Sequence, residues 1–157
     1  PTGGDTAWGN MYLAYQALPA HLKQEIKGRK AIHDATYNSA GMIRKGMKDV
    51  TDPREAPGAH QPLVSKHPES GLPCLFLGRR RNSYILGMDL DASNQLLDEL
   101  WAHIDNPEFT FTQVWQLHDL ILWDNRCTLH RRDSFDPQSR RLMHRTQIKG
   151  SSVIPFE

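Results

Sequence analysis

Residues 123–150 read WDNRCTLHRRDSFDPQSRRLMHRTQIKG, and this stretch decides how the rest of the chain is interpreted. It predicts one strand, one turn and one returning strand. The apolar run at residues 120–123 has strand length, and residues 136–139 are turn formers, with a proline that presets φ. Residues 141–149 then alternate, so that Arg141, Met143 and Arg145 would share one face of a strand.

One imidazole and two guanidinium groups in this stretch predict a binding site. Arg141 and Arg145 are four residues apart, which is roughly 13 Å along a strand, and His130 lies 141 − 130 = 11 residues before Arg141. A neutral imidazole binds borderline metals, and guanidinium forks grip carboxylates. The alternatives are a hydrogen-bonded structural histidine and a solvated basic strand, although Met143 on the arginine face argues against simple solvent exposure.

At these residues the chain resembles the taurine / 2,4-dichlorophenoxyacetate dioxygenase family of Fe(II)- and 2-oxoglutarate-dependent oxygenases. The shared pattern is WDNRxTxH, eleven residues to an arginine, and then Arg-x-x-x-Arg inside RxMHRTxIxG. The resemblance covers essentially all 157 residues. It implies a double-stranded β-helix (jelly roll) that holds its metal ligands on facing strands at the open end.

The resemblance also implies roles for single residues. His130 would be the distal ligand of a facial triad, two histidines and one carboxylate, which leaves iron positions open for 2-oxoglutarate and dioxygen. Arg141 would clamp the distal carboxylate of 2-oxoglutarate, and Thr6, in the GGDT turn, would hydrogen-bond the same cosubstrate. Arg145 matches the position that meets an anionic group on the primary substrate, and Asn38 matches a small polar substrate contact.

Two further parts of the chain receive supporting roles. Trp123 would lie in the shell around the metal ligand, and residues 124–126 would act as scaffold for the turn before it. Residues 37–59 would form a lid or insertion loop. Their glycines at 41 and 46, weak helical periodicity over 37–49, and loop composition over 50–59 indicate little to bury.

Family members carry an H-x-D motif upstream of GGDT, but GGDT begins here at Gly3. The one literal match, His103-Ile104-Asp105, falls at the end of a predicted helix and does not precede GGDT. The chain therefore supplies one iron ligand of three. We interpret it as the C-terminal portion of a single jelly-roll domain, spanning residues 1–157, whose N-terminal part is either absent or not resolved. We expect this portion to be inactive alone.

The remaining sequence predicts a mostly β fold with flanking helices, in the α+β class. Helices are expected at residues 10–18, 19–27 and 91–104, where apolar side chains recur at helical spacing. An extended piece leads through Trp8. Further strands are expected at residues 30–36, 61–66, 72–78 and 108–116, with a hairpin joining the middle two.

Composition excludes several classes of protein. The net charge of +1 implies no general polyanion partner, and the arginine triplet at residues 79–81 is best explained as a solvated patch, so no nucleic-acid partner is expected. No apolar run reaches membrane-spanning length, and no signal peptide is recognisable. Cys74 and Cys127 are 127 − 74 = 53 positions apart and make neither a disulfide framework nor a zinc motif, which favours a cytoplasmic setting.

By resemblance, the intact protein would hydroxylate a small anionic organic substrate similar to taurine or an alkylsulfonate, converting 2-oxoglutarate to succinate and CO2. The cofactors implied are Fe(II), 2-oxoglutarate and dioxygen. An alkyl sulfate, an aryloxyalkanoate or a carnitine precursor are alternative substrates, and a non-catalytic jelly-roll anion-binding protein is the alternative class. No membrane partner is expected, and a homo-oligomer is compatible with the sequence.

Overall fold

Three small antiparallel sheets form the framework of this chain. The structure is a computed structural model, and it describes residues 3–38 and 41–157. The sheets have the strand orders β6-β1-β7, β2-β3 and β5-β4-β8. In chain order the elements are β1 (Thr6–Asn10), α1 (Met11–Ala17), α2 (Ala20–Ile26), β2 (Lys30–Asp34), β3 (Gly58–Pro62), β4 (Val64–Lys66), β5 (Pro73–Leu75), α3 (Leu90–Ile104), β6 (Thr110–Gln113), β7 (Thr128–Arg132) and β8 (Ile154–Pro155).

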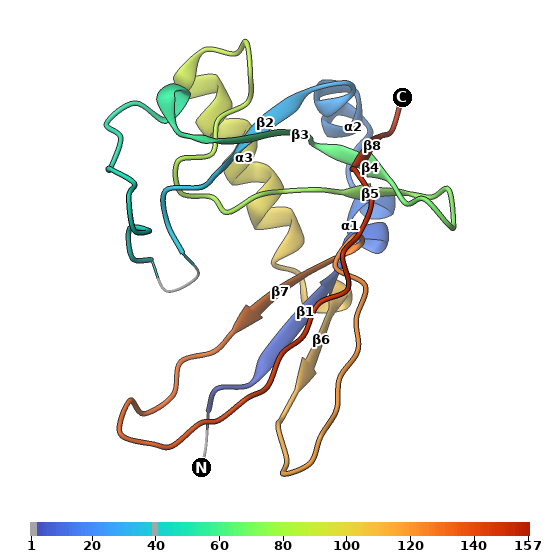
Figure 1. Ribbon diagram of the computed structural model, residues 1–157. Coiled ribbons are helices and arrows are strands. Elements are labelled where there is room, and N and C mark those ends of the chain that lie inside the picture. Colours follow the sequence, from blue (N-terminus) through green and yellow to red (C-terminus); the bar gives the residue numbers. More distant parts are fainter. Residues whose placement is uncertain (1–2, 39–40) are drawn as a thin grey trace.

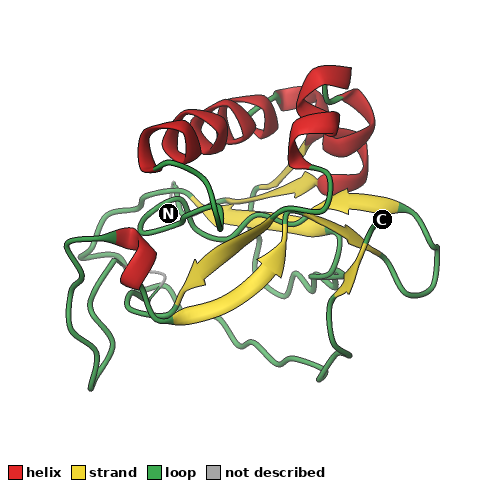
Figure 2. Cartoon of the chain, turned by 90° about the horizontal axis from the view of Figure 1, so that it is seen from above, coloured by secondary structure: helices red, strands yellow, loops and turns green. Residues whose placement is uncertain are grey.

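The three α-helices gather on one side of the strands, as the view from above shows (Figure 2). Strands with helices confined to one face agree with the α+β class expected from the sequence. In Figure 1 the β6-β1-β7 sheet extends away from the rest of the molecule, near the N-terminal end of the trace. Among the described residues, no helix has both the length and the apolar character needed to cross a bilayer.

The helices form where local signals predict them. Asn10 caps α1, since its side-chain oxygen accepts hydrogen bonds from the backbone N–H groups of Tyr12 and Leu13. Asp89 caps α3 in the same way. The three helices lie within one residue of the expected bounds. Their inward faces contribute fully buried side chains to the main core, including Ala14, Ile26, Leu97 and Leu100.

The central strand β1 sorts its side chains onto two faces. Trp8 lies directly opposite Phe111 of β6 and His130 of β7, and directly opposite residues project to the same face of an antiparallel sheet. The other face looks toward the helices, because Arg131 of β7 pairs with Asp105 at the end of α3 at 2.8 Å. His130 therefore lies on the face that points away from the helices.

Two strands predicted in the C-terminal stretch are wrong. Residues 120–123 and 141–149 have no strand conformation, and Leu120, Leu122 and Ile148 are each at least 90% exposed. A strand is stable only when a neighbouring backbone satisfies its N–H and C=O groups, and in the described part of the chain these two segments pair with no strand. The turn between them is confirmed, since Ser139 N donates to Asp136 O at 2.9 Å.

The middle of the chain also departs from expectation in part. The weak helical periodicity over residues 37–49 produces no helix in its described residues, which instead contain an isolated bridge between Tyr37 and Ile43. Residues 39–40 lie outside the described part. β3 begins at Gly58, inside the expected loop, because it pairs with β2 along its whole length. The hairpin of β4 and β5 is confirmed.

We expect Leu100→Ala to lower the free energy of unfolding by about 2–5 kcal/mol, because Leu100 is fully buried and its truncation leaves a cavity in the core. Glu99→Ala, one residue earlier on the exposed side of α3, is the matched control and should change it by less than about 0.5 kcal/mol. Urea unfolding followed by circular dichroism measures both. Equal effects of the two substitutions would contradict the placement of this core.

Candidate active site

Arg141 and His130 lie beside one extended stretch of chain that leads into β1. Gly4, Thr6 and Trp8 are alternate residues leading into and along β1, over roughly 13 Å at strand spacing. Arg141 Nη2 donates a hydrogen bond to Gly4 O at 3.2 Å, and His130 lies opposite Trp8 in the register of β1 and β7. Thr6 lies between them. The three residues predicted to hold a metal and its cosubstrate are thus arranged in a row.

The environment of His130 favours its neutral form. Its ring lies 5.3 Å from that of Trp123, which in turn lies 5.3 Å from that of Trp8. The packing around the imidazole lowers the pKa of His130 below its usual value, and the positive charge of Arg145 lowers it further. His130 is open to solvent on its other side. A neutral imidazole at physiological pH is the form that binds metal ions.

The approach of Arg141 to the chain depends on glycine. Gly4 has φ +74°, and a Cβ added there would lie only 3.1 Å from Arg141 Nε. The guanidinium also lies 5.7 Å from the centre of the Phe135 ring. Among the described residues, the Gly4 carbonyl is the one acceptor bonded to Arg141, so most of its five donors remain available to an anion.

Thr6 is buried, with 8% of its surface exposed, and its hydroxyl is oriented by a tryptophan. Trp115 Nε1 donates to Thr6 Oγ1 at 2.9 Å, so the hydroxyl keeps its own proton to donate elsewhere. Sequence reasoning missed Trp115, which is 109 residues from Thr6 in the chain. It also missed Trp8, although its position two residues after Thr6 on a strand was a usable signal.

The remaining predicted residues fall into two groups. Trp123 contacts the His130 ring, and Arg145 lies close enough to influence its pKa. Asn38 follows β2, in a different sheet, and its side-chain oxygen accepts a hydrogen bond from Met42 N at 3.0 Å. This oxygen therefore helps to close a local turn that follows β2.

The chain supplies one of the three iron ligands that the family resemblance leads us to expect. His130 offers one nitrogen. The described residues contain one group of three potential metal ligands, formed by His67, Asp124 and Cys127, and His130 does not belong to it. The literal H-x-D match is engaged elsewhere, since His103 Nε2 is 2.7 Å from Ala14 O and Asp105 pairs with Arg131. At the other end of the row, the guanidinium of Arg141 suits a carboxylate, because it is positively charged and most of its N–H donors have no partner among the described residues.

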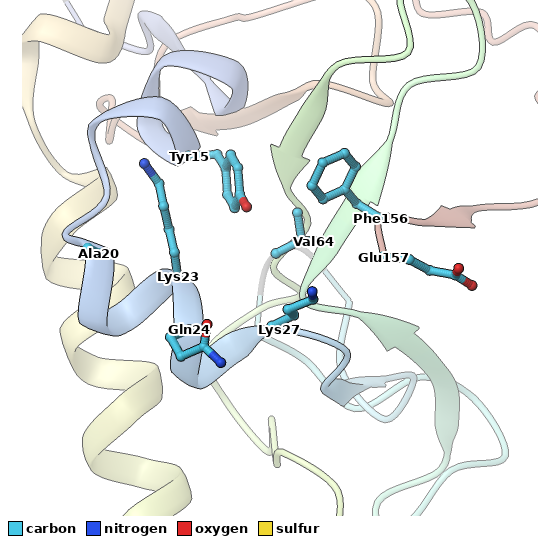
Figure 3. A pocket seen from close by; sticks show the side chains of 8 residues that line it. All are labelled: Tyr15, Ala20, Lys23, Gln24, Lys27, Val64, Phe156 and Glu157. Atoms are coloured by element: carbon cyan, nitrogen blue, oxygen red, sulfur yellow. The ribbon is translucent and has the colours of Figure 1, made fainter.

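Two hollows of about 260 Å³ each are present in the described part of the chain. One lies between α1, α2 and the C-terminal residues, where the sticks in Figure 3 show its lining. It shares no residue with the row described above. The second lies against Trp8 and Phe111, at the end of the β6-β1-β7 sheet, so the candidate active site borders an apolar recess.

Known proteins resemble this chain over most of its length. Residues 1–147 match the family model described as "Taurine catabolism dioxygenase TauD, TfdA family". The alpha-ketoglutarate-dependent 2,4-dichlorophenoxyacetate dioxygenase of Cupriavidus pinatubonensis is 35% identical over 154 residues, which cover 98% of this chain and 53% of that protein. The alkylsulfatase of Acinetobacter baylyi is 31% identical, with 95% and 49% of the two chains covered.

Solved structures give the same result. The crystal structure of AAD-2 in complex with Mn(II) and N-oxalylglycine has a TM-score of 0.77 and 33% identity, covering 92% of this chain and 56% of that one. A taurine dioxygenase from Burkholderia xenovorans has a TM-score of 0.67 and 32% identity, covering 85% and 42%. The chain spans about half the length of the curated relatives it matches. On the match over residues 1–147, the chain belongs to the TauD, TfdA family of taurine catabolism dioxygenases.

Proposed function

We propose that the full protein is an Fe(II)- and 2-oxoglutarate-dependent dioxygenase that hydroxylates a small anionic organic substrate. The observation that carries the proposal is the row along β1, with Arg141 at Gly4, His130 opposite Trp8, and Thr6 between them. A keto diacid needs a cation at one end and a metal at the other. Family membership independently supports the same chemistry.

Each residue of the row has a distinct task in this proposal. His130 holds the metal through a neutral nitrogen, and Arg141 binds the distal carboxylate of 2-oxoglutarate as a charge-assisted pair. Thr6 donates its hydroxyl proton to the cosubstrate, held in position by Trp115. When bound, iron with 2-oxoglutarate and dioxygen supplies the oxidation, while the chain orients the reactants and limits access of water.

We propose that residues 1–157 are the C-terminal portion of a single jelly-roll domain. In the described part of the chain β7 pairs with β1 on one side only, so the strand that carries His130 is an edge strand. Val114, Leu117, Leu120 and Leu122 are exposed nearby in sequence, as expected for side chains that another segment covers. A strand bearing the other two iron ligands would pair with the free edge of β7, and residues 37–59 would act as a lid.

The primary substrate is an organic acid whose anionic group meets Arg145. Taurine-like sulfonates are the first candidates, in keeping with the family. An aryloxyalkanoate is the second candidate, because Trp8, Phe111, Trp115 and Trp123 surround the metal end of the row with aromatic rings. The 2,4-dichlorophenoxyacetate dioxygenases among the relatives support that alternative. Since Cys74 and Cys127 are free thiols, we retain a cytoplasmic setting as an expectation.

We expect Arg141→Ala in the full-length protein to raise the 2-oxoglutarate concentration for half-maximal turnover by about 10- to 100-fold, because the variant loses one charge-assisted contact with the carboxylate. Iron content should change little. His130→Ala should instead remove most of the bound iron. Metal analysis and succinate formation measure the two effects. Arg140→Ala, on an exposed neighbour, is the control and should resemble the wild type. Equal losses of iron in the Arg141 and His130 variants would argue against the proposed division of roles.

We expect Arg145→Ala to raise the pKa of His130, because it removes a positive charge that disfavours the imidazolium form. In the wild type the folded pKa lies below the unfolded value. Protonation of His130 therefore lowers the stability of the folded state only as the pH falls below about 6.5, the usual pKa of an unfolded histidine. An NMR titration of the His130 ring protons in the metal-free protein gives the pKa directly. A shift in Arg140→Ala of the same size would show that the effect is not specific to Arg145.

A further inference from the structure

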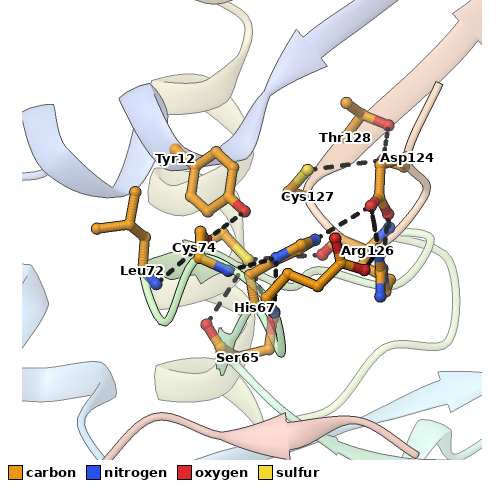
Figure 4. Close-up of polar contacts among 11 residues, drawn as sticks. Tyr12, Ser65, His67, Leu72, Cys74, Asp124, Arg126, Cys127 and Thr128 are labelled. Carbon is orange, nitrogen blue, oxygen red and sulfur yellow. Dashed lines mark hydrogen bonds and ion pairs between the residues drawn. The ribbon is translucent and has the colours of Figure 1, made fainter. Parts of the chain in front are cut away.

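A second polar network joins two turns that are far apart in the sequence. One turn closes the hairpin of β4 and β5 at residues 67–71, and the other, at residues 124–127, leads directly into β7. Figure 4 shows the side chain of His67 reaching from the first turn to Asp124 in the second. Since the second turn leads into β7, which carries His130, this network adjoins the strand that bears the proposed metal ligand.

His67 uses both ring nitrogens and is 7% exposed. Nδ1 accepts hydrogen bonds from the backbone N–H groups of Glu69 and Ser70, each at 3.3 Å. Nδ1 is therefore unprotonated, and in the neutral ring the proton belongs to Nε2. Nε2 lies 3.1 Å from Asp124 Oδ2, to which it donates. One imidazole thus closes its own turn and tethers a second turn.

Asp124 is fixed on its other sides by Arg126. The carboxylate accepts from Arg126 N at 2.8 Å, Arg126 Nε at 2.9 Å and Arg126 Nη2 at 2.6 Å. These contacts with the guanidinium hold the pKa of Asp124 well below its usual range. Arg126 Nη2 also pairs with Glu69 at 2.9 Å, which returns the network to the hairpin turn. His67, Glu69, Arg126 and Asp124 therefore form a closed ring of contacts.

Asp124 transmits this constraint to the candidate active site. Its backbone carbonyl accepts from Thr128 Oγ1 at 2.7 Å, at the first residue of β7. The residue before it is Trp123, whose ring packs against His130. A shift of Asp124 would displace both the start of the strand that carries His130 and the ring that supports it.

The same cluster resembles a metal site, because donor atoms of His67, Asp124 and Cys127 lie within 4.8 Å of one another. Hydrogen bonding argues against that role. A metal on Nε2 would require both ring nitrogens to lack a proton, whereas metal-bound histidines normally donate from the second nitrogen. The Asp124 oxygens are moreover already bonded to Arg126. The contacts fit a tether better than a metal centre.

We infer that His67 is a positioning residue, which holds the Asp124 turn so that His130 and Trp123 keep the geometry needed for metal binding. This inference rests on the proposed function, because it concerns the same metal. The contact between His67 and Asp124 joins residues 57 positions apart, so no short-range sequence pattern contains it.

Two substitutions in the full-length protein separate the two tasks of His67. In His67→Asn, the amide oxygen replaces Nδ1 in the hairpin turn but the side chain is too short to reach Asp124. In His67→Gln, the amide nitrogen replaces Nε2 toward Asp124 but the turn loses its acceptor. Each variant loses one group of hydrogen bonds, so both should lower the Tm of the metal-free protein by comparable amounts.

The affinity for Mn(II), which resists oxidation by air, is measured by isothermal titration for each protein. We expect His67→Asn to weaken it by about 10-fold, the effect of losing support around a ligand, and His67→Gln to stay within about twofold of the wild type. Equal losses in both variants, or an unchanged affinity in His67→Asn, would overturn the inference and leave the proposed function standing. A wild-type protein that binds no Mn(II) would overturn both.

Discussion

The double pairing of β1 is the constraint on which the rest of the candidate site depends. Because β1 lies between β6 and β7, Trp8 is fixed opposite Phe111 on one side and His130 on the other. This register assigns Thr6 and Trp8 to the face away from the helices, and it delivers a histidine from residue 130 to the same face. A slip of one residue would turn His130 toward α3 and separate it from Arg141.

The electrostatics of the site follow from this placement. Arg145 brings positive charge close to the imidazole of His130 and lowers its pKa, and Arg141 adds a second positive charge beside Gly4. Trp8, Trp115 and Trp123 add apolar ring surface beside the imidazole of His130. These charges and rings support the proposal that the substrate is a small organic anion.

Local signals predicted the helices and the turn at residues 136–139, because caps, helical periodicity and a proline act over a few residues. The strands at residues 120–123 and 141–149 were wrong, because alternation shows which side chains could share a face but cannot supply a backbone to pair with. The contacts of Thr6 with Trp115 and of His67 with Asp124 join residues 109 and 57 positions apart, and no short-range pattern contains them. The sequence pattern singled out His130 and Arg141, the family resemblance added Thr6, and the register around β1 arranges the three residues in a row.

The most direct test of this account is a crystal structure of the full-length protein with Mn(II) and N-oxalylglycine, an unreactive analogue of 2-oxoglutarate. The account predicts Mn(II) bound to the imidazole of His130, the distal carboxylate of the analogue paired with the guanidinium of Arg141, and the Thr6 hydroxyl donating to the analogue between them. Mn(II) bound without His130, or an analogue whose distal carboxylate lies away from Arg141, would contradict it.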